Sequence, residues 1–152
     1  MDIENSILPW LGRTVKFMDL YIEDQLAAAG LPLTKLQFVF LMVISNHNNQ
    51  PQNNLAELTG RDKTTFTRNL NTLEKKGLVC RKPSQGDKRI KLVCITELGK
   101  DFKKKSEPII KKIISEVEED ISIEERESFK LILTKIRTKL ILLRESNCTN
   151  QI

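Results

Sequence analysis

The sequence predicts a mainly α-helical fold with six helices and one short β-hairpin between the fourth helix and the fifth. Long stretches carry apolar residues at spacings of three and four, which is typical of helices that bury one face. Serine, threonine and aspartate stand where several of these stretches begin, as helix caps do. Near the middle, two β-prone segments flank a polar turn at residues 83–87, which predicts the hairpin.

Length and composition limit the possible classes of protein. A chain of 152 residues, 39% hydrophobic and 30% charged, fits one packed domain with or without an extension for oligomerisation. The acidic start at Asp2 and Glu4 does not resemble a signal peptide, and the longest apolar run, residues 38–44, is far shorter than the ~18 residues of a membrane span. The odd number of cysteines, in no metal-ligand spacing, favours a reducing cytoplasmic setting: Cys80, Cys94 and Cys148.

The first two helices are predicted from apolar stripes and local caps. The first spans about residues 6–28 and ends before Gly30, and its two apolar stripes predict that it is covered on two sides. The second spans about residues 35–46, because Thr34 and Gln37 form a capping box. Its predicted core face consists of Leu36, Val39, Phe40, Val43 and Ile44.

Residues 53–95 contain a helix, a turn with Gly60, a second helix that ends at Gly77, and the hairpin. This order is typical of a winged helix-turn-helix, whose second helix enters the DNA major groove. The helix before the turn begins between Pro51 and Asn54, and whether the preceding residues pair with the hairpin stays open. The helix after the turn, capped by Asp62, buries one side: Phe66, Leu70 and Leu73. Its other side is polar: Lys63, Thr64, Thr67, Arg68 and Asn71.

The positive charge is concentrated in the same segment. Residues 61–91 hold ten basic and three acidic side chains, a net charge of +7, whereas the whole chain is +5, so all other residues sum to −2. A local cluster of cations neutralises phosphates and releases their counterions, which drives binding to nucleic acid. The sequence therefore predicts a double-stranded DNA-binding module.

The end of the hairpin and the last two helices complete the prediction. Three hairpin residues can reach the core: Val79, Leu92 and Ile95. The fifth helix, residues 97–119, is capped by Thr96, and Pro108 should kink or break it. Ser122 and Glu125 form a capping box at the start of the sixth helix, and the polar tail from Ser146 should fray.

The chain ends are too apolar for one small winged domain to cover. We therefore expect residues 1–30 and 97–152 to form a helical dimerisation region, and residues 31–96 to form the DNA-binding domain. A two-fold dimer places its recognition helices about 34–36 Å apart on a pseudo-palindromic site.

Several short motifs together resemble the MarR family (multiple antibiotic resistance regulators). They are Leu55-Ala56-Glu57, the run from Asp62 to Arg68, the run from Leu73 to Val79, Asp87-Lys88-Arg89, and the run from Ile95 to Gly99. The resemblance covers residues 30–105 by motif and the rest by helix order. At the start of the third helix the chain departs from the family, because Pro51 and Asn54 stand where Thr or Ser and then Glu are usual.

The resemblance implies a homodimeric transcription factor, in most cases a repressor that releases DNA when a small ligand or an oxidant acts. It also implies that Arg89 enters the minor groove and that Asp87 braces it. Arg68 is expected to contact a base or a phosphate, since arginine to guanine is the commonest specific contact, and Arg81, Lys82 and Lys88 are expected to bind phosphates rather than bases. The predicted DNA-binding residues are Arg61, Lys63, Thr64, Thr65, Thr67, Arg68, Asn71, Arg81, Lys82, Asp87, Lys88 and Arg89.

Other interpretations carry less weight. Four aromatic residues could line a pocket for a small aromatic effector, although core and dimer packing is the simpler explanation: Trp10, Phe17, Tyr21 and Phe38. His47 is the only histidine, so no metal or cofactor is expected, and nothing marks a reactive cysteine. A DNA-binding protein that responds to no effector stays open as an alternative function.

Two other classes of protein are disfavoured. A winged helix that binds protein would not need the +7 segment, and an enzyme would need a nucleophile–base pair or a phosphate loop that the sequence lacks.

Overall fold

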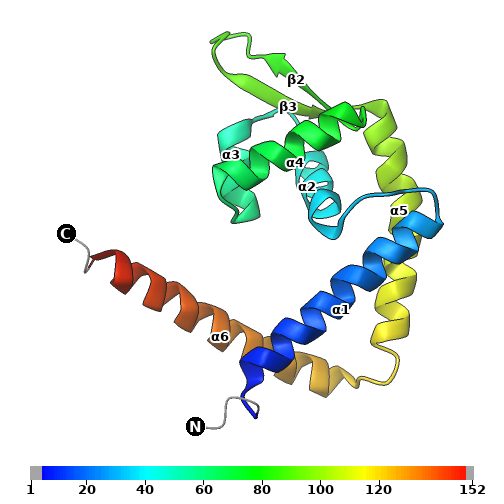
Figure 1. The fold of residues 1–152 in the computed structure, drawn as a ribbon, viewed down its shortest axis with the longest axis vertical. Helices are drawn as coiled ribbons and strands as arrows, with labels where there is room; N and C mark the ends of the chain where they lie inside the picture. The colour runs from blue at the N-terminus through cyan, green and yellow to red at the C-terminus, as the bar shows by residue number, and fades with distance from the viewer. Residues whose placement is uncertain (1–4, 150–152) are drawn as a thin grey trace. The chain divides into compact units, whose positions relative to one another are not determined.

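The computed structural model describes residues 5–149 and has the predicted fold class: mostly helices, with a small antiparallel sheet that includes the hairpin between the fourth helix and the fifth. The chain divides into two compact units, Met1–Ile113 and Ile114–Ile152. The first unit contains the helix-turn-helix and the hairpin (Figure 1). Within the described residues, no helix combines the length and the apolar character needed to cross a membrane.

Helices α1 (Ile7–Ala28) and α2 (Lys35–Asn46) have the predicted positions. Gly30 follows α1 with a positive φ of 74°, and its backbone N–H and that of Leu31 donate back to the last turn, to Ala27 O and Leu26 O. The capping box of Thr34 and Gln37 is present at α2. These local signals depend on neighbours within a few residues, so the sequence alone was enough to find them.

The core face of α2 was predicted only in part. Phe40 and Ile44 are buried as predicted, but Leu41 is also fully buried, whereas Val39 is exposed. Because α2 is apolar on nearly every side, spacing alone could not choose its inward face. The ring of Phe40 meets that of Phe66 on helix α4 (Lys63–Lys75) at 5.0 Å between centroids, which joins the first helices to the helix-turn-helix.

The question of a strand before the third helix has a clear answer. Strand β1 (Gln50–Pro51) pairs antiparallel with β3 (Lys91–Ile95), and β3 pairs antiparallel with β2 (Val79–Pro83), so the sheet order is β1-β3-β2. Helix α3 (Gln52–Thr59) begins directly after β1 without a side-chain cap. Helix α4 (Lys63–Lys75) follows the turn at Gly60.

The core residues of the hairpin were predicted only in part. Val79 and Ile95 are buried as expected, but Val93 is fully buried and Leu92 only half-buried. Val93 shares one face of β3 with the buried Ile95, because side chains two residues apart on a strand point to the same side, and Leu92 lies on the other face. The prediction of Leu92 together with Ile95 as core residues did not follow this alternation.

Helix α5 (Glu97–Val117) begins as predicted but ends before the predicted residue 119, and α6 spans Ile123–Thr149. Helix α5 runs through Pro108 without a break, and α6 continues past Ser146, where fraying was expected. The predicted capping box of α6 is present, with the Ser122 N–H donating to Glu125 at 2.8 Å and the Glu125 N–H donating to Ser122 Oγ at 3.2 Å. In the second unit, α6 buries none of its described apolar side chains.

The core of the first unit lies among α2, α4 and the sheet. Its buried residues include Leu26, Leu33, Phe40, Leu41, Ile44, Leu55, Phe66, Leu70, Leu73, Val79, Val93 and Phe102. Polar contacts join the outer helices to this core: Lys35 Nζ binds Asp19 of α1 at 2.8 Å, and Lys103 Nζ of α5 donates to Asn46 Oδ1 at 2.9 Å. The packing holds α4 with one side against the core and the other side exposed.

Candidate nucleic-acid interface

Helix α4 has the two faces that the sequence predicts. Phe66, Leu70 and Leu73 are fully buried, and the buried amide of Asn69 donates to the Thr65 carbonyl oxygen one turn earlier, at 2.9 Å. The polar residues together line one shallow hollow on the surface: Lys63, Thr64, Thr67, Arg68 and Asn71. We call this hollow the recognition face.

The two ends of α4 are fixed by local hydrogen bonds. Asp62 accepts a hydrogen bond from the backbone N–H of Thr65 at 2.8 Å, and this bond lowers the pKa of the Asp62 carboxyl. At the other end, Gly77 adopts φ 71°, and the Leu78 N–H donates to Leu73 O at 3.0 Å. Since β2 begins at Val79, this turn leads the chain directly from α4 into the hairpin.

The hairpin turn carries exposed cations. Lys82, Lys88 and Arg89 are exposed, as are Arg61 between the two helices and Asp87. The Asp87 carboxylate accepts a hydrogen bond from the backbone N–H of Arg89 at 2.9 Å. Asp87 therefore shapes the turn through the main chain, and the Arg89 guanidinium extends from a defined position.

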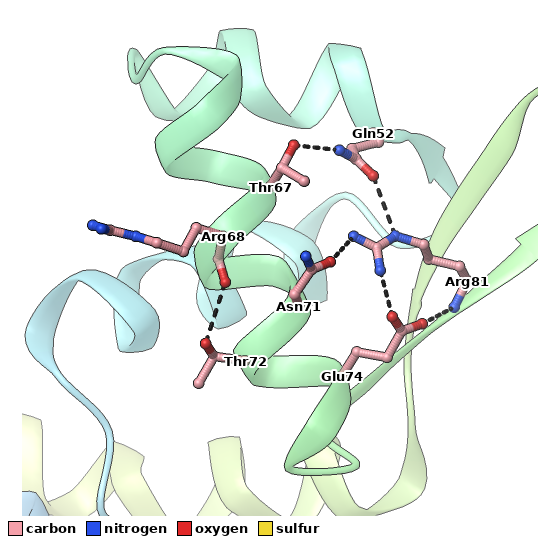
Figure 2. A network of polar contacts seen from close by, with 7 residues as sticks. All are labelled: Gln52, Thr67, Arg68, Asn71, Thr72, Glu74 and Arg81. Atoms are coloured by element: carbon pink, nitrogen blue, oxygen red, sulfur yellow. Dashed lines mark hydrogen bonds and ion pairs between the residues drawn. The ribbon is translucent and has the colours of Figure 1, made fainter.

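Arg81 lies in a network that joins the hairpin to the recognition helix (Figure 2). Its guanidinium pairs with Glu74, and it donates to Asn71 Oδ1 at 2.7 Å and to Gln52 Oε1 at 3.2 Å. Glu74 also accepts from the Arg81 backbone N–H at 3.1 Å, and Gln52 donates to Thr67 Oγ1 at 2.8 Å. Only 20% of the Arg81 side chain is exposed, unlike the cations at the hairpin tip.

Two members of this network were missed in the sequence. Neither Gln52 nor Glu74 was among the predicted DNA-binding residues. Gln52 lies 29 residues from Arg81, and their contact depends on β1 placing the start of α3 beside the sheet. The only local sign of this network in the sequence was the short spacing between Glu74 and Arg81 on either side of the turn at Gly77.

The two described cysteines and the four aromatic residues of the predicted pocket do not line the recognition face. Cys80 and Cys94 are directly opposite each other on β2 and β3, and burial raises the pKa of the Cys94 thiol; the side chain of Cys148 lies outside the described residues. Trp10, Phe17 and Tyr21 are exposed on α1, whereas Phe38 is half-buried and packs against the core.

A separate hollow of about 300 Å³ lies between the loop after α1 and the start of α5, and none of the four predicted pocket residues lines it. Within the described residues, no three His, Cys, Asp or Glu side chains gather as metal ligands would.

Helix-turn-helix, hairpin and exposed recognition face together define a winged helix-turn-helix protein. Residues 33–91 match the MarR family, and these residues extend from the start of α2 into β3. This match lies in the winged domain of the chain, in agreement with the motifs, and the MarR family consists of transcription regulators rather than enzymes.

Solved structures with the same fold extend the similarity beyond that segment. A mutant MarR from E. coli complexed with operator DNA is 26% identical with a TM-score of 0.72, covering 90% of this chain and 99% of that one. S. aureus MepR in a DNA complex is 23% identical with a TM-score of 0.78, covering 91% of this chain and 99% of that one. A MarR/EmrR family regulator from Acinetobacter sp. ADP1 is 16% identical with a TM-score of 0.80, covering 93% and 99%.

Proposed function

We propose that this protein is a homodimeric transcription regulator that binds double-stranded DNA in a sequence-specific way, as a repressor that a small-molecule effector relieves. The observation that carries the proposal is the recognition face of α4 beside an exposed basic hairpin, within a segment of net charge +7. The match to the MarR family and the DNA complexes of E. coli MarR and S. aureus MepR support it. Such a regulator would work in the cytoplasm.

The proposed DNA contacts divide by position. Arg68, Lys63 and Thr64 would enter the major groove, where arginine and lysine read guanine edges. Arg89 would enter the minor groove, while Arg61, Lys82 and Lys88 would neutralise phosphates.

The proposed dimer uses residues 1–30 and 97–152. Trp10 and Phe17 of α1 are 63% and 74% exposed, and Phe129 and Leu140 of α6 are each 54% exposed. So many exposed large apolar side chains at both chain ends indicate an interface, because monomeric proteins rarely leave large apolar patches in water.

Selection of bound sequences from random duplex DNA, at one fixed salt concentration, tests the whole proposal. We expect a two-fold symmetric consensus with half-sites about one helical turn apart, and a dimer by sedimentation equilibrium. A monomer that recovers no enriched sequence would disprove the proposal.

Replacing Arg68 with alanine tests the recognition face. We expect the sequence preference to relax at one position of each half-site, at a cost of roughly 1–3 kcal/mol for the preferred base. Lys75→Ala is the matched control, because Lys75 is also an exposed cation on α4 but lies outside the recognition face. Equal losses of preference in both variants would show that Arg68 contributes only charge.

A regulator without an effector is the second candidate. Phe38 packs against the core while Trp10, Phe17 and Tyr21 are exposed, so these aromatic residues do not form an enclosed pocket within one chain. Titrating phenolic compounds against a preformed DNA complex distinguishes the two candidates. Release of DNA at a saturating concentration supports the effector-relieved repressor, and unchanged binding supports the second candidate.

A further inference from the structure

The network around Arg81 fixes which hydrogen-bonding groups the recognition face presents. A guanidinium has only donors, so each of its partners must turn an oxygen toward it. Arg81 therefore determines the orientation of the Asn71 amide, whose Oδ1 accepts from Nη2 at 2.7 Å. It determines the orientation of the Gln52 amide in the same way, through Nε at 3.2 Å.

The consequence for Asn71 is a fixed polarity. Its oxygen is held by Arg81, so its amide nitrogen, with two N–H donors, is the group left for a ligand (Figure 2). Asn71 is exposed and lines the recognition face with Lys63 and Arg68. Asparagine reads adenine by using its oxygen and its nitrogen together, and this contact would require Asn71 to leave Arg81.

The same polarity extends along α4 to Thr67. Since the oxygen of Gln52 is held by Arg81, its nitrogen donates to Thr67 Oγ1 at 2.8 Å. The hydroxyl proton of Thr67 then points away from Gln52. With the cationic side chains of Lys63 and Arg68, the recognition face offers mainly donors.

We infer that Arg81 is a positioning residue that makes Asn71 a donor-only reader, so that Asn71 selects guanine in the major groove and rejects adenine. Guanine fits because its major-groove edge presents two acceptors, O6 and N7, whereas adenine pairs one acceptor with one donor. This inference rests on the proposed DNA-binding function and replaces the phosphate contact that the sequence suggested for Arg81. The small exposed fraction of Arg81 and its three intramolecular partners support this role.

Three variants and the wild type, each used in selection from random duplex DNA, test the inference. Asn71→Ala identifies the base position that Asn71 reads, and we expect this base to be guanine in the wild type. Asn71→Asp keeps an oxygen for Arg81 but turns an acceptor outward, so the preference should move from guanine to cytosine, whose N4 is a donor. Arg81→Met frees the Asn71 amide to rotate, and adenine should gain about tenfold relative to guanine at that position.

Glu74→Gln is the control for general loosening of the network. It removes the charge of the closest partner of Arg81 but leaves Arg81 able to donate to Asn71, so the preference for guanine should persist even if the melting temperature falls. Because the readout is a ratio between bases, a uniform loss of affinity does not affect it. Asn71→Asp keeps the Arg81 contact and gives a result even if Arg81→Met does not fold.

The outcomes separate the two proposals. If the wild type selects adenine at the Asn71 position, if Asn71→Ala changes no base preference, or if Asn71→Asp still selects guanine, the inference is wrong. If the folded wild type enriches no DNA sequence at all, the proposed function itself fails.

Discussion

Replacing Gly99 with alanine is expected to destabilise the protein by roughly 3 kcal/mol, near the upper end of overpacking effects. A Cβ at this position would lie 2.1 Å from the Leu78 carbonyl oxygen and 2.7 Å from Ile95 Cγ1. The oxygen belongs to the backbone, so it cannot rotate aside. It also accepts the Thr96 N–H at 3.1 Å, which means that the start of α5 would have to move away from the base of the hairpin.

Urea unfolding followed by circular dichroism, at one protein concentration, measures this loss. Gly86→Ala is the matched control, because a Cβ at Gly86 in the hairpin turn would meet nothing within 4 Å. We expect that control to stay within about 0.5 kcal/mol of the wild type. Equal stabilities of the two variants would mean that α5 does not dock on Leu78 as the structure has it.

The sequence was sufficient for several features that depend on close neighbours along the chain. Thr34 with Gln37 and Ser122 with Glu125 form their capping boxes, and Asp62 caps α4, because each acceptor and its donor are three residues apart. The two faces of α4 were also predictable, since its apolar and polar residues alternate with the helical period.

Features that depend on distant parts of the chain were not predictable. Strand β1 has only two residues and no pattern of its own, and the inward face of α2 is ambiguous in an almost wholly apolar helix. The role of Arg81 is the most consequential example. Charge and position alone make it look like the other hairpin cations, whereas three partners from two helices make it part of the protein's own structure.

Arg89 differs from Arg81, whose guanidinium is held by partners within the protein. Arg89 is exposed, no partner of its guanidinium appears among the described contacts, and its backbone N–H is held by Asp87 at 2.9 Å. We expect Arg89→Ala to weaken DNA binding by about ten- to a hundredfold on every sequence tested. We also expect the dependence of affinity on salt to fall by about one counterion, because one cation no longer reaches the DNA.

Fluorescence anisotropy with an operator duplex and an unrelated duplex, at several salt concentrations, measures both effects. Lys104→Ala is the matched control, since Lys104 is an exposed cation on α5, outside both the recognition face and the hairpin. It removes the same charge and should leave the affinity within about twofold, because screened charges beyond a Debye length contribute little. If Arg89→Ala binds as tightly as Lys104→Ala while remaining folded and dimeric, the hairpin is not a DNA-binding wing, and the exposed cations at its tip need another explanation.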